Sequence, residues 1–182
     1  IRLPAEVLGL QEIRLTDAGQ LRYTHHLKEH GWSAVFGAPI QKRKRGRGSV
    51  RPGGVAILAR AHLGLQHIAP SSIESQELWN STRFVHAALP AGEAGKSAVH
   101  IISFYGFSNS ARDPSRRAEN ERLLALLFKH VASLGQVPVF LLGDWNTPTK
   151  SSPVLESAIG SGHFWDVEQC FADAEGRPAN NT

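Results

Sequence analysis

The sequence lacks several features that would assign it to a special class of protein. Its single cysteine, Cys170, excludes an internal disulfide and with it a disulfide-stapled secreted scaffold. Its longest uninterrupted apolar run is six residues, Leu123 to Phe128, whereas a membrane span needs about 20. No charged-then-apolar segment opens the chain, so no signal peptide is visible. We therefore expect an intracellular protein with no membrane partner and no disulfide partner.

Methionine is also absent from the 182 residues, so Ile1 is not a translation start and we expect a fragment or a processed product. The rest of the composition is ordinary, with 41% hydrophobic and 20% charged residues, which argues against disorder over the whole length. The chain shows neither an internal repeat nor a linker between domains. We expect one domain that occupies residues 1–182.

Acidic residues are missing from residues 42–51, which read KRKRGRGSVR and contain six basic side chains. The whole chain has 20 basic and 16 acidic residues, so the remainder, with 14 against 16, is slightly acidic. The candidate nucleic-acid-binding side chains in this segment are Lys42, Arg43, Lys44, Arg45 and Arg47. Such a cluster gains affinity for a phosphate backbone by counterion release. It also fits a solvated loop, or a nuclear-localisation patch that would place the protein in the nucleus.

The hydrophobic pattern predicts both strands and helices. Strands are expected at residues 7–10, 33–36, 54–59, 65–69, 83–89, 99–105 and 137–142, those at 54–59 and 137–142 being buried. Helices are expected from Thr16 or Asp17 to Gly31, from Pro114 (capped by Asp113) to Gly135, and from Pro153 toward Ile159. The polar tail from Asp173 is expected to fray. Several strands in succession, followed by strand–helix–strand, predict layered α/β packing with at least one mixed sheet.

Polar side chains occur where three of the predicted strands stop. Glu12 follows the apolar run VLGL and Gln11, Tyr105 follows VHIISF, and Asp144 and Asn146 follow VFLLG. Loops beyond strand ends line the ligand crevice of open sheets. These side chains would converge if their strands are neighbours.

The residue types at these strand ends fit one chemistry. Carboxylate and amide oxygens are hard ligands that suit Mg²⁺ or Mn²⁺. A second carboxylate can orient a water, while Asn and Tyr can donate to a phosphate oxygen. Each residue alone has a simpler explanation, Glu12 as a solvated strand end, the GDxN run as a turn and Tyr105 as a core aromatic. Their joint occurrence favours metal-assisted attack on a phosphodiester.

Four segments carry a resemblance to a known superfamily. They are VLGLQEIRL at 7–15, GGVAILAR at 53–60, VHIISFYGFSN at 99–109 and FLLGDWNTPT at 140–149. In this order they resemble the endonuclease/exonuclease/phosphatase superfamily, which includes exonuclease III-like apurinic endonucleases and the endonuclease domains of LINE-type retrotransposons. The resemblance implies an α/β fold, a two-layer β-sandwich flanked by helices.

The resemblance also implies a role for each matching residue. Glu12 would be the ligand of Mg²⁺ (or Mn²⁺), and Asp144 would align and activate the attacking water. Asn146 would contact the scissile phosphate or support the site, and Tyr105 would hydrogen-bond the phosphate. Asn109 would contact nucleic acid, although it stands one place later than the family's Asn, and the run from Tyr105 lacks the family's Pro.

Two further elements of the superfamily have no counterpart in the chain. Family members begin with a strand that carries an Asn and end with a strand that carries an Asp-His pair, and no Asp-His dipeptide occurs here. We therefore expect an incomplete sandwich with poor stability and little activity as it stands. The expected parent function is DNA cleavage by a retroelement-type or apurinic-type endonuclease. The alternatives are a decayed, non-catalytic remnant, a nucleic-acid-binding pseudo-nuclease, or a phosphatase or deadenylase of the same superfamily, and the oligomeric state stays open.

A second candidate metal site lies on the first predicted helix. His26 and His30 are four residues apart, a spacing that can bind a metal. No Glu stands between them as it does in an HExxH motif, so a solvated helix face is the simpler interpretation.

Overall fold

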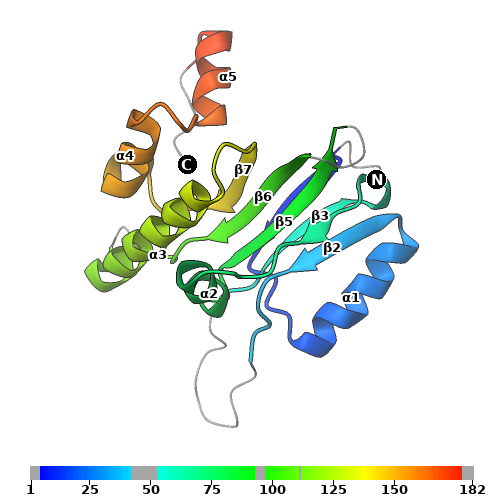
Figure 1. The fold of residues 1–182 in the computed structure, drawn as a ribbon. Coiled ribbons are helices and arrows are strands. Elements are labelled where there is room, and N and C mark those ends of the chain that lie inside the picture. The colour runs from blue at the N-terminus through cyan, green and yellow to red at the C-terminus, as the bar shows by residue number, and fades with distance from the viewer. Residues whose placement is uncertain (1–4, 42–52, 93–96, 111, 178–182) are drawn as a thin grey trace.

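The structure, a computed structural model, describes residues 5–41, 53–92, 97–110 and 112–177. Two β-sheets lie face to face, with helices outside them (Figure 1). The first sheet is antiparallel, with strand order β1-β3-β2. Its strands are β1 (Val7–Gln11), β2 (Trp32–Phe36) and β3 (Val55–Arg60).

The second sheet has the order β4-β5-β6-β7 and is mixed. Its strands are β4 (Gln66–His67), β5 (Phe84–Ala91), β6 (Ser97–Tyr105) and β7 (Val139–Asp144). β6 and β7 are parallel because the helix α3 (Pro114–Ser133) connects them, whereas the other pairs are antiparallel. This confirms the predicted α/β sandwich and its mixed sheet.

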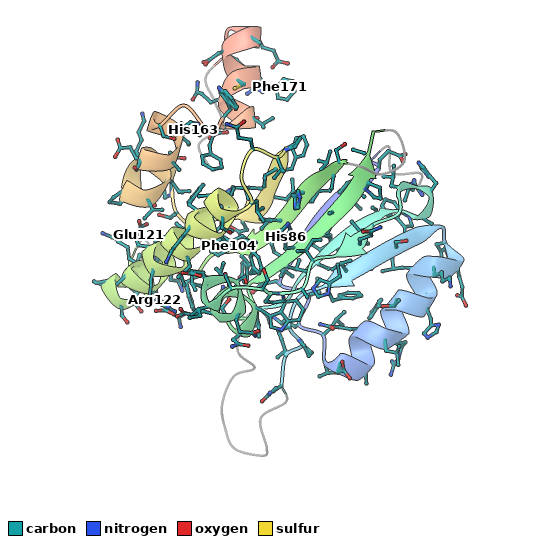
Figure 2. The ribbon with its side chains drawn as sticks, viewed as in Figure 1. His86, Phe104, Glu121, Arg122, His163 and Phe171 are labelled. Carbon is teal, nitrogen blue, oxygen red and sulfur yellow. The ribbon has the colours of Figure 1, made fainter. Side chains whose placement is uncertain are left out.

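Alternation along the strands of the second sheet divides the interior into two cores. In β5 and β6, Val85, Ile101 and Tyr105 face the first sheet, where they meet Val55 and Ile57 of β3. The intervening residues face the helices. That core consists of Leu78, Phe84, Ile102, Phe104, Leu123, Leu124, Leu127, Val131 and Leu155. Figure 2 shows Phe104 and His86 on this side of the sheet, where α3 lies across the strands.

The remaining helices are α1 (Asp17–Glu29), α2 (Ile73–Asn80), α4 (Pro153–Gly160) and α5 (Val167–Glu175). Predicted local signals fix the ends of two helices. Thr16 caps α1, which closes before Gly31 at φ 76°, and Asp113 accepts hydrogen bonds from the first turn of α3. Among the described residues, no helix is both long and apolar enough to cross a bilayer.

Several predicted elements differ from the structure. The strand expected at 65–69 shortens to Gln66–His67, and α2 follows it, which the pattern did not predict. Ser72 and Ser75 form a capping box at the start of α2, and only Ser75 and Leu78 of this helix are buried, so its apolar periodicity is weak. The tail at Asp173 is helical to Glu175, because Asp166 caps α5 and Gly176 closes it in the left-handed conformation.

The strand expected at 137–142 is not buried as predicted. β7 pairs with β6 alone among the described strands, and its Phe140 is 55% exposed. Edge position explains the difference, because a strand with one neighbour lacks cover on its other side. By contrast, β3 is the middle strand of its sheet, and Val55 to Ala59 are buried as expected.

Candidate active site

The carboxyl ends of β6 and β7 bring two predicted site residues together. These strands are parallel, so their carboxyl ends meet at one edge of the sheet, and Tyr105 stands opposite Asp144 in the ladder. The chain stays paired one step further, where the Gly106 N–H donates to the Asp144 carbonyl oxygen at 2.7 Å. Asp144 is exposed, whereas Tyr105 is 3% exposed.

β1 brings Glu12 to the same edge from the first sheet. Gln11 Nε2 donates to Ser103 Oγ on β6 at 3.1 Å, and a Cβ added at Gly9 would lie 2.9 Å from the Leu142 Cβ of β7. The pKa of Glu12 is held below its usual range, first by a hydrogen bond from Arg14 and then by the Tyr105 hydroxyl. The exposed Glu12 carboxylate is therefore anionic and adjacent to Tyr105.

The Tyr105 hydroxyl is held in a fixed position. It lies 2.9 Å from Ser108 Oγ. Burial raises the pKa of Tyr105, and the neighbouring Glu12 carboxylate acts in the same direction. The phenol is therefore protonated at neutral pH and can donate a hydrogen bond to an anion.

Asn146 links the two loops that leave β6 and β7. Its backbone N–H donates to Asp144 Oδ1 at 3.1 Å, and its Nδ2 donates to the Gly106 carbonyl oxygen at 3.2 Å. The Ser110 hydroxyl donates to the Asn146 carbonyl oxygen. One amide hydrogen of Asn146 thus supports the loop, and the second is the one that can contact a phosphate.

Strained backbone gathers at this end of the molecule. Non-glycine residues with positive φ in the described part of the chain are Glu12 (57°), Arg14 (47°), Thr82 (63°), Asn109 (67°) and Asn146 (51°). Thr82 belongs with the others because its carbonyl accepts from Gly54, whose own carbonyl accepts from Ile13 beside Glu12. Such conformations persist where surrounding contacts over-determine them, and they concentrate at functional sites.

Arg83 is a member of this site that the sequence analysis missed. It is 2% exposed, and its Nη1 donates to the carbonyl oxygens of Tyr105 at 3.1 Å and Gly106 at 2.7 Å. Its guanidinium carbon lies 3.9 Å from the ring centre of Phe107 and 4.8 Å from that of Tyr105. The Arg83 charge therefore lies beneath the phenol, and no local pattern in the sequence announces it.

Asn120 is a second missed residue, and a signal for it was present. Its fully buried side chain accepts from Phe107 N at 2.9 Å and donates to the Trp145 carbonyl oxygen at 3.1 Å. It thereby joins the loop after β6 to the loop after β7. Asn120 shares the apolar face of α3 with Leu123, Leu124 and Leu127, so helical spacing alone places this amide in the interior.

The other predicted nucleic-acid contacts lie at the periphery or outside the description. Asn109 is exposed in the turn after β6, where its carbonyl accepts from Arg112 N and Asp113 N. Lys42, Arg43, Lys44, Arg45 and Arg47 lie outside the described residues. The described chain on both sides of them is tied down beside Glu12. Ile40 N donates to the Leu15 carbonyl at 2.9 Å, and Arg14 N donates to the Gly53 carbonyl at 3.4 Å.

The donor set at this edge fits a hard divalent cation. Glu12 and Asp144 present exposed carboxylates, and the neighbouring groups are amide, hydroxyl and carbonyl oxygens rather than imidazole or thiolate. Glu12 would hold the ion, after Arg14 gives up its 2.6 Å hydrogen bond to the carboxylate. A cation bound there would neutralise charge that develops on a phosphate.

The comparisons with known proteins agree with this geometry. The model of the Endonuclease/Exonuclease/phosphatase family matches residues 1–181, and the chain belongs to this family. The family comprises hydrolytic, generally divalent-metal-dependent phosphodiesterases and phosphatases. No curated protein matches the sequence.

Solved structures share the fold at low sequence identity. The catalytic domain of human Nocturnin with bound sulfate has a TM-score of 0.63 and 15% identity, over 95% of this chain and 63% of that one. The *Xenopus laevis* APE2 catalytic domain has a TM-score of 0.50 and 18% identity, over 80% of this chain and 51% of that one. ANGEL2, a 2′,3′-cyclic phosphatase in complex with adenosine-2′,3′-vanadate, has a TM-score of 0.50 and 21% identity, over 87% and 44%. The chain therefore spans less than two thirds of the length of each.

Proposed function

We propose that the chain carries part of the active site of a metal-dependent DNA endonuclease of the retroelement or apurinic type. Glu12 holds Mg²⁺ (or Mn²⁺), Asp144 orients the attacking water, and Tyr105 and Asn146 donate to the scissile phosphate. The observation that supports this proposal is the meeting of Glu12, Tyr105 and Asp144 at one edge, with Tyr105 and Asp144 in register.

Nucleic acid is the substrate that the charge distribution favours. The described ends of the segment around residues 42–52 are hydrogen-bonded to residues 14 and 15, directly after Glu12. Six basic side chains between residues 42 and 51 therefore leave the body of the protein beside the candidate metal ligand. A polyanion that reaches the cleft would gain contacts to its backbone there.

Other substrates and a non-catalytic role are the alternatives. The similarity to ANGEL2 supports a 2′,3′-cyclic phosphate as a second candidate substrate, because that structure holds adenosine-2′,3′-vanadate. A pseudo-nuclease would keep the basic segment and bind DNA without cutting it.

The test has a binding step and a cleavage step. The 182-residue chain is titrated with Mn²⁺, and broadening of amide signals around Glu12 and Asp144 locates the ion. Nicking of supercoiled plasmid in MgCl₂ is then measured for the natural open reading frame that contains the chain. We expect Glu12→Gln and Asp144→Asn to abolish nicking by more than about 100-fold. Unchanged nicking in either variant contradicts the assignment.

Matched controls separate the site from general charge effects. Glu6→Gln removes an exposed carboxylate just before β1 and should leave nicking intact. Neutralising Lys42, Arg43, Lys44 and Arg45 should flatten the dependence of DNA affinity on salt, with a slope change of about −0.9 per lost phosphate contact. An unaltered slope would remove the basic segment from the proposal. Hydrolysis of adenosine-2′,3′-cyclic phosphate with no nicking would favour the phosphatase alternative.

A further inference from the structure

Three potential ligand side chains lie together on the last turn of α1, far in sequence from the candidate active site. His26, Glu29 and His30 each offer one ligand atom, and these atoms lie within 4.8 Å of one another. All three side chains are exposed, so small rotamer changes that close this spacing around an ion meet no packing resistance.

The orientation of His30 matches that of a metal ligand. Its Nδ1 lies 2.8 Å from the His26 carbonyl oxygen, and a carbonyl only accepts, so Nδ1 carries the hydrogen. The neutral His30 ring therefore presents a lone pair on Nε2. Metal-binding histidines are typically held in this way, with the second ring nitrogen donating to a carbonyl or carboxylate.

The donor set of this cluster selects a different metal from the active-site carboxylates. The His26 and His30 rings lie 4.5 Å apart between centroids, and His26 Nδ1 is 3.9 Å from a Glu29 carboxylate oxygen. Two imidazoles with one carboxylate are typical zinc ligands, whereas Mg²⁺ prefers oxygen ligands throughout.

The position on the helix also favours a cation. The carboxyl end of a helix carries partial negative charge, and α1 ends at Glu29 with His30 as its C-cap. α1 contains no fully buried residue, so packing holds its last turn only weakly. A cross-link between residues four apart would stabilise that turn directly.

We propose that His26, Glu29 and His30 form a surface Zn²⁺ site that stabilises the carboxyl end of α1, with water completing the coordination. This site is independent of the proposed nuclease function, and its occupation does not require phosphodiester cleavage.

Isothermal titration with ZnCl₂ tests the site, in buffer with excess MgCl₂ to occupy oxygen-ligand sites and in a Cys170→Ser background to remove the exposed thiol. We expect one zinc per chain from this cluster. His30→Ala should lower the affinity by about 10-fold or more, whereas His25→Ala, an exposed histidine one position outside the cluster, should not change it.

A second measurement distinguishes the proposed site from zinc bound elsewhere. Zn²⁺ should raise the melting temperature of His25→Ala and leave that of His30→Ala unchanged, because binding to the folded state stabilises it. Circular dichroism without metal should show the same helix content in both variants. Equal zinc affinities for His25→Ala and His30→Ala, or no zinc-dependent rise in melting temperature, would overturn the proposal.

Discussion

A chain of three histidines between the second sheet and α3 makes the stability of this protein depend on pH. His86 Nε2 lies 2.9 Å from His100 Nδ1 on β6, and His86 Nδ1 lies 3.1 Å from His130 Nε2 on α3. His86 is 1% exposed and therefore sits in this chain as a neutral ring. Burial, followed by the charges of His130 and His100, lowers its pKa from 6.5 to about 3.

Other charged groups packed around the chain mostly act in the same direction. Burial lowers the pKa of His67 on β4 and of His130, although Glu74 on α2 raises the pKa of His130. Glu74 itself forms an ion pair with Lys129 of α3. The buried face thus favours uncharged imidazoles, and acid works against it.

The expected loss of stability follows from the pKa of His86. Above its unfolded pKa of 6.5 both states are neutral there, and as pH falls toward the folded pKa of about 3 the unfolded chain binds a proton that the native protein excludes. From pH 6.5 to pH 5 this costs about 2 kcal/mol, at about 1.36 kcal/mol per pH unit. This window stays above the ordinary range of carboxylates, so histidines dominate it.

Urea unfolding at about pH 7.5 and about pH 5 measures this loss. We expect His86→Gln, which keeps one donor and one acceptor, to lose about 2 kcal/mol less than the wild type between the two pH values. His25→Gln, an exposed histidine on α1, should behave as the wild type does. Parallel pH dependences for wild type and His86→Gln would refute the reasoning.

Four further substitutions test the packing that positions the site. Gly106→Ala should destabilise by about 3 kcal/mol in urea unfolding, because its Cβ would lie 2.0 Å from the Trp145 carbonyl oxygen, whereas Gly160→Ala, with nothing within 4 Å, should cost nothing; equal midpoints would contradict this. Leu124→Ala in the core should cost about 3 kcal/mol, against little for Leu21→Ala, which is 63% exposed; a small loss for Leu124→Ala would contradict the packing described. Asn120→Leu should cost about 2 kcal/mol by leaving Phe107 N and the Trp145 carbonyl unpaired, and should also slow the proposed nicking; full stability would show that the amide does not join the two loops. Asp166→Ala should cost about 1 kcal/mol and speed amide exchange within α5, and unchanged exchange would argue against the cap.

Much of the candidate site could be predicted because its residues follow strands directly along the chain. Short apolar runs place Glu12, Tyr105 and Asp144 at strand ends, and a strand end is a local property. The neighbourhood of β1, β6 and β7 is not local, since it depends on how the two sheets pack. Arg83 illustrates the difference, because its value lies in three contacts with residues 22 to 24 positions away.

The sequence by itself determined the helix limits set by Asp113, Pro114 and Gly31, because capping and left-handed turns involve neighbours along the chain. It also determined that positive charge gathers in one segment on a slightly acidic chain. Tertiary structure alone decided that β7 is an exposed edge strand and that three histidines from three elements form one hydrogen-bonded chain. Burial and long-range pairing arise from packing between distant segments, which no window of local sequence contains.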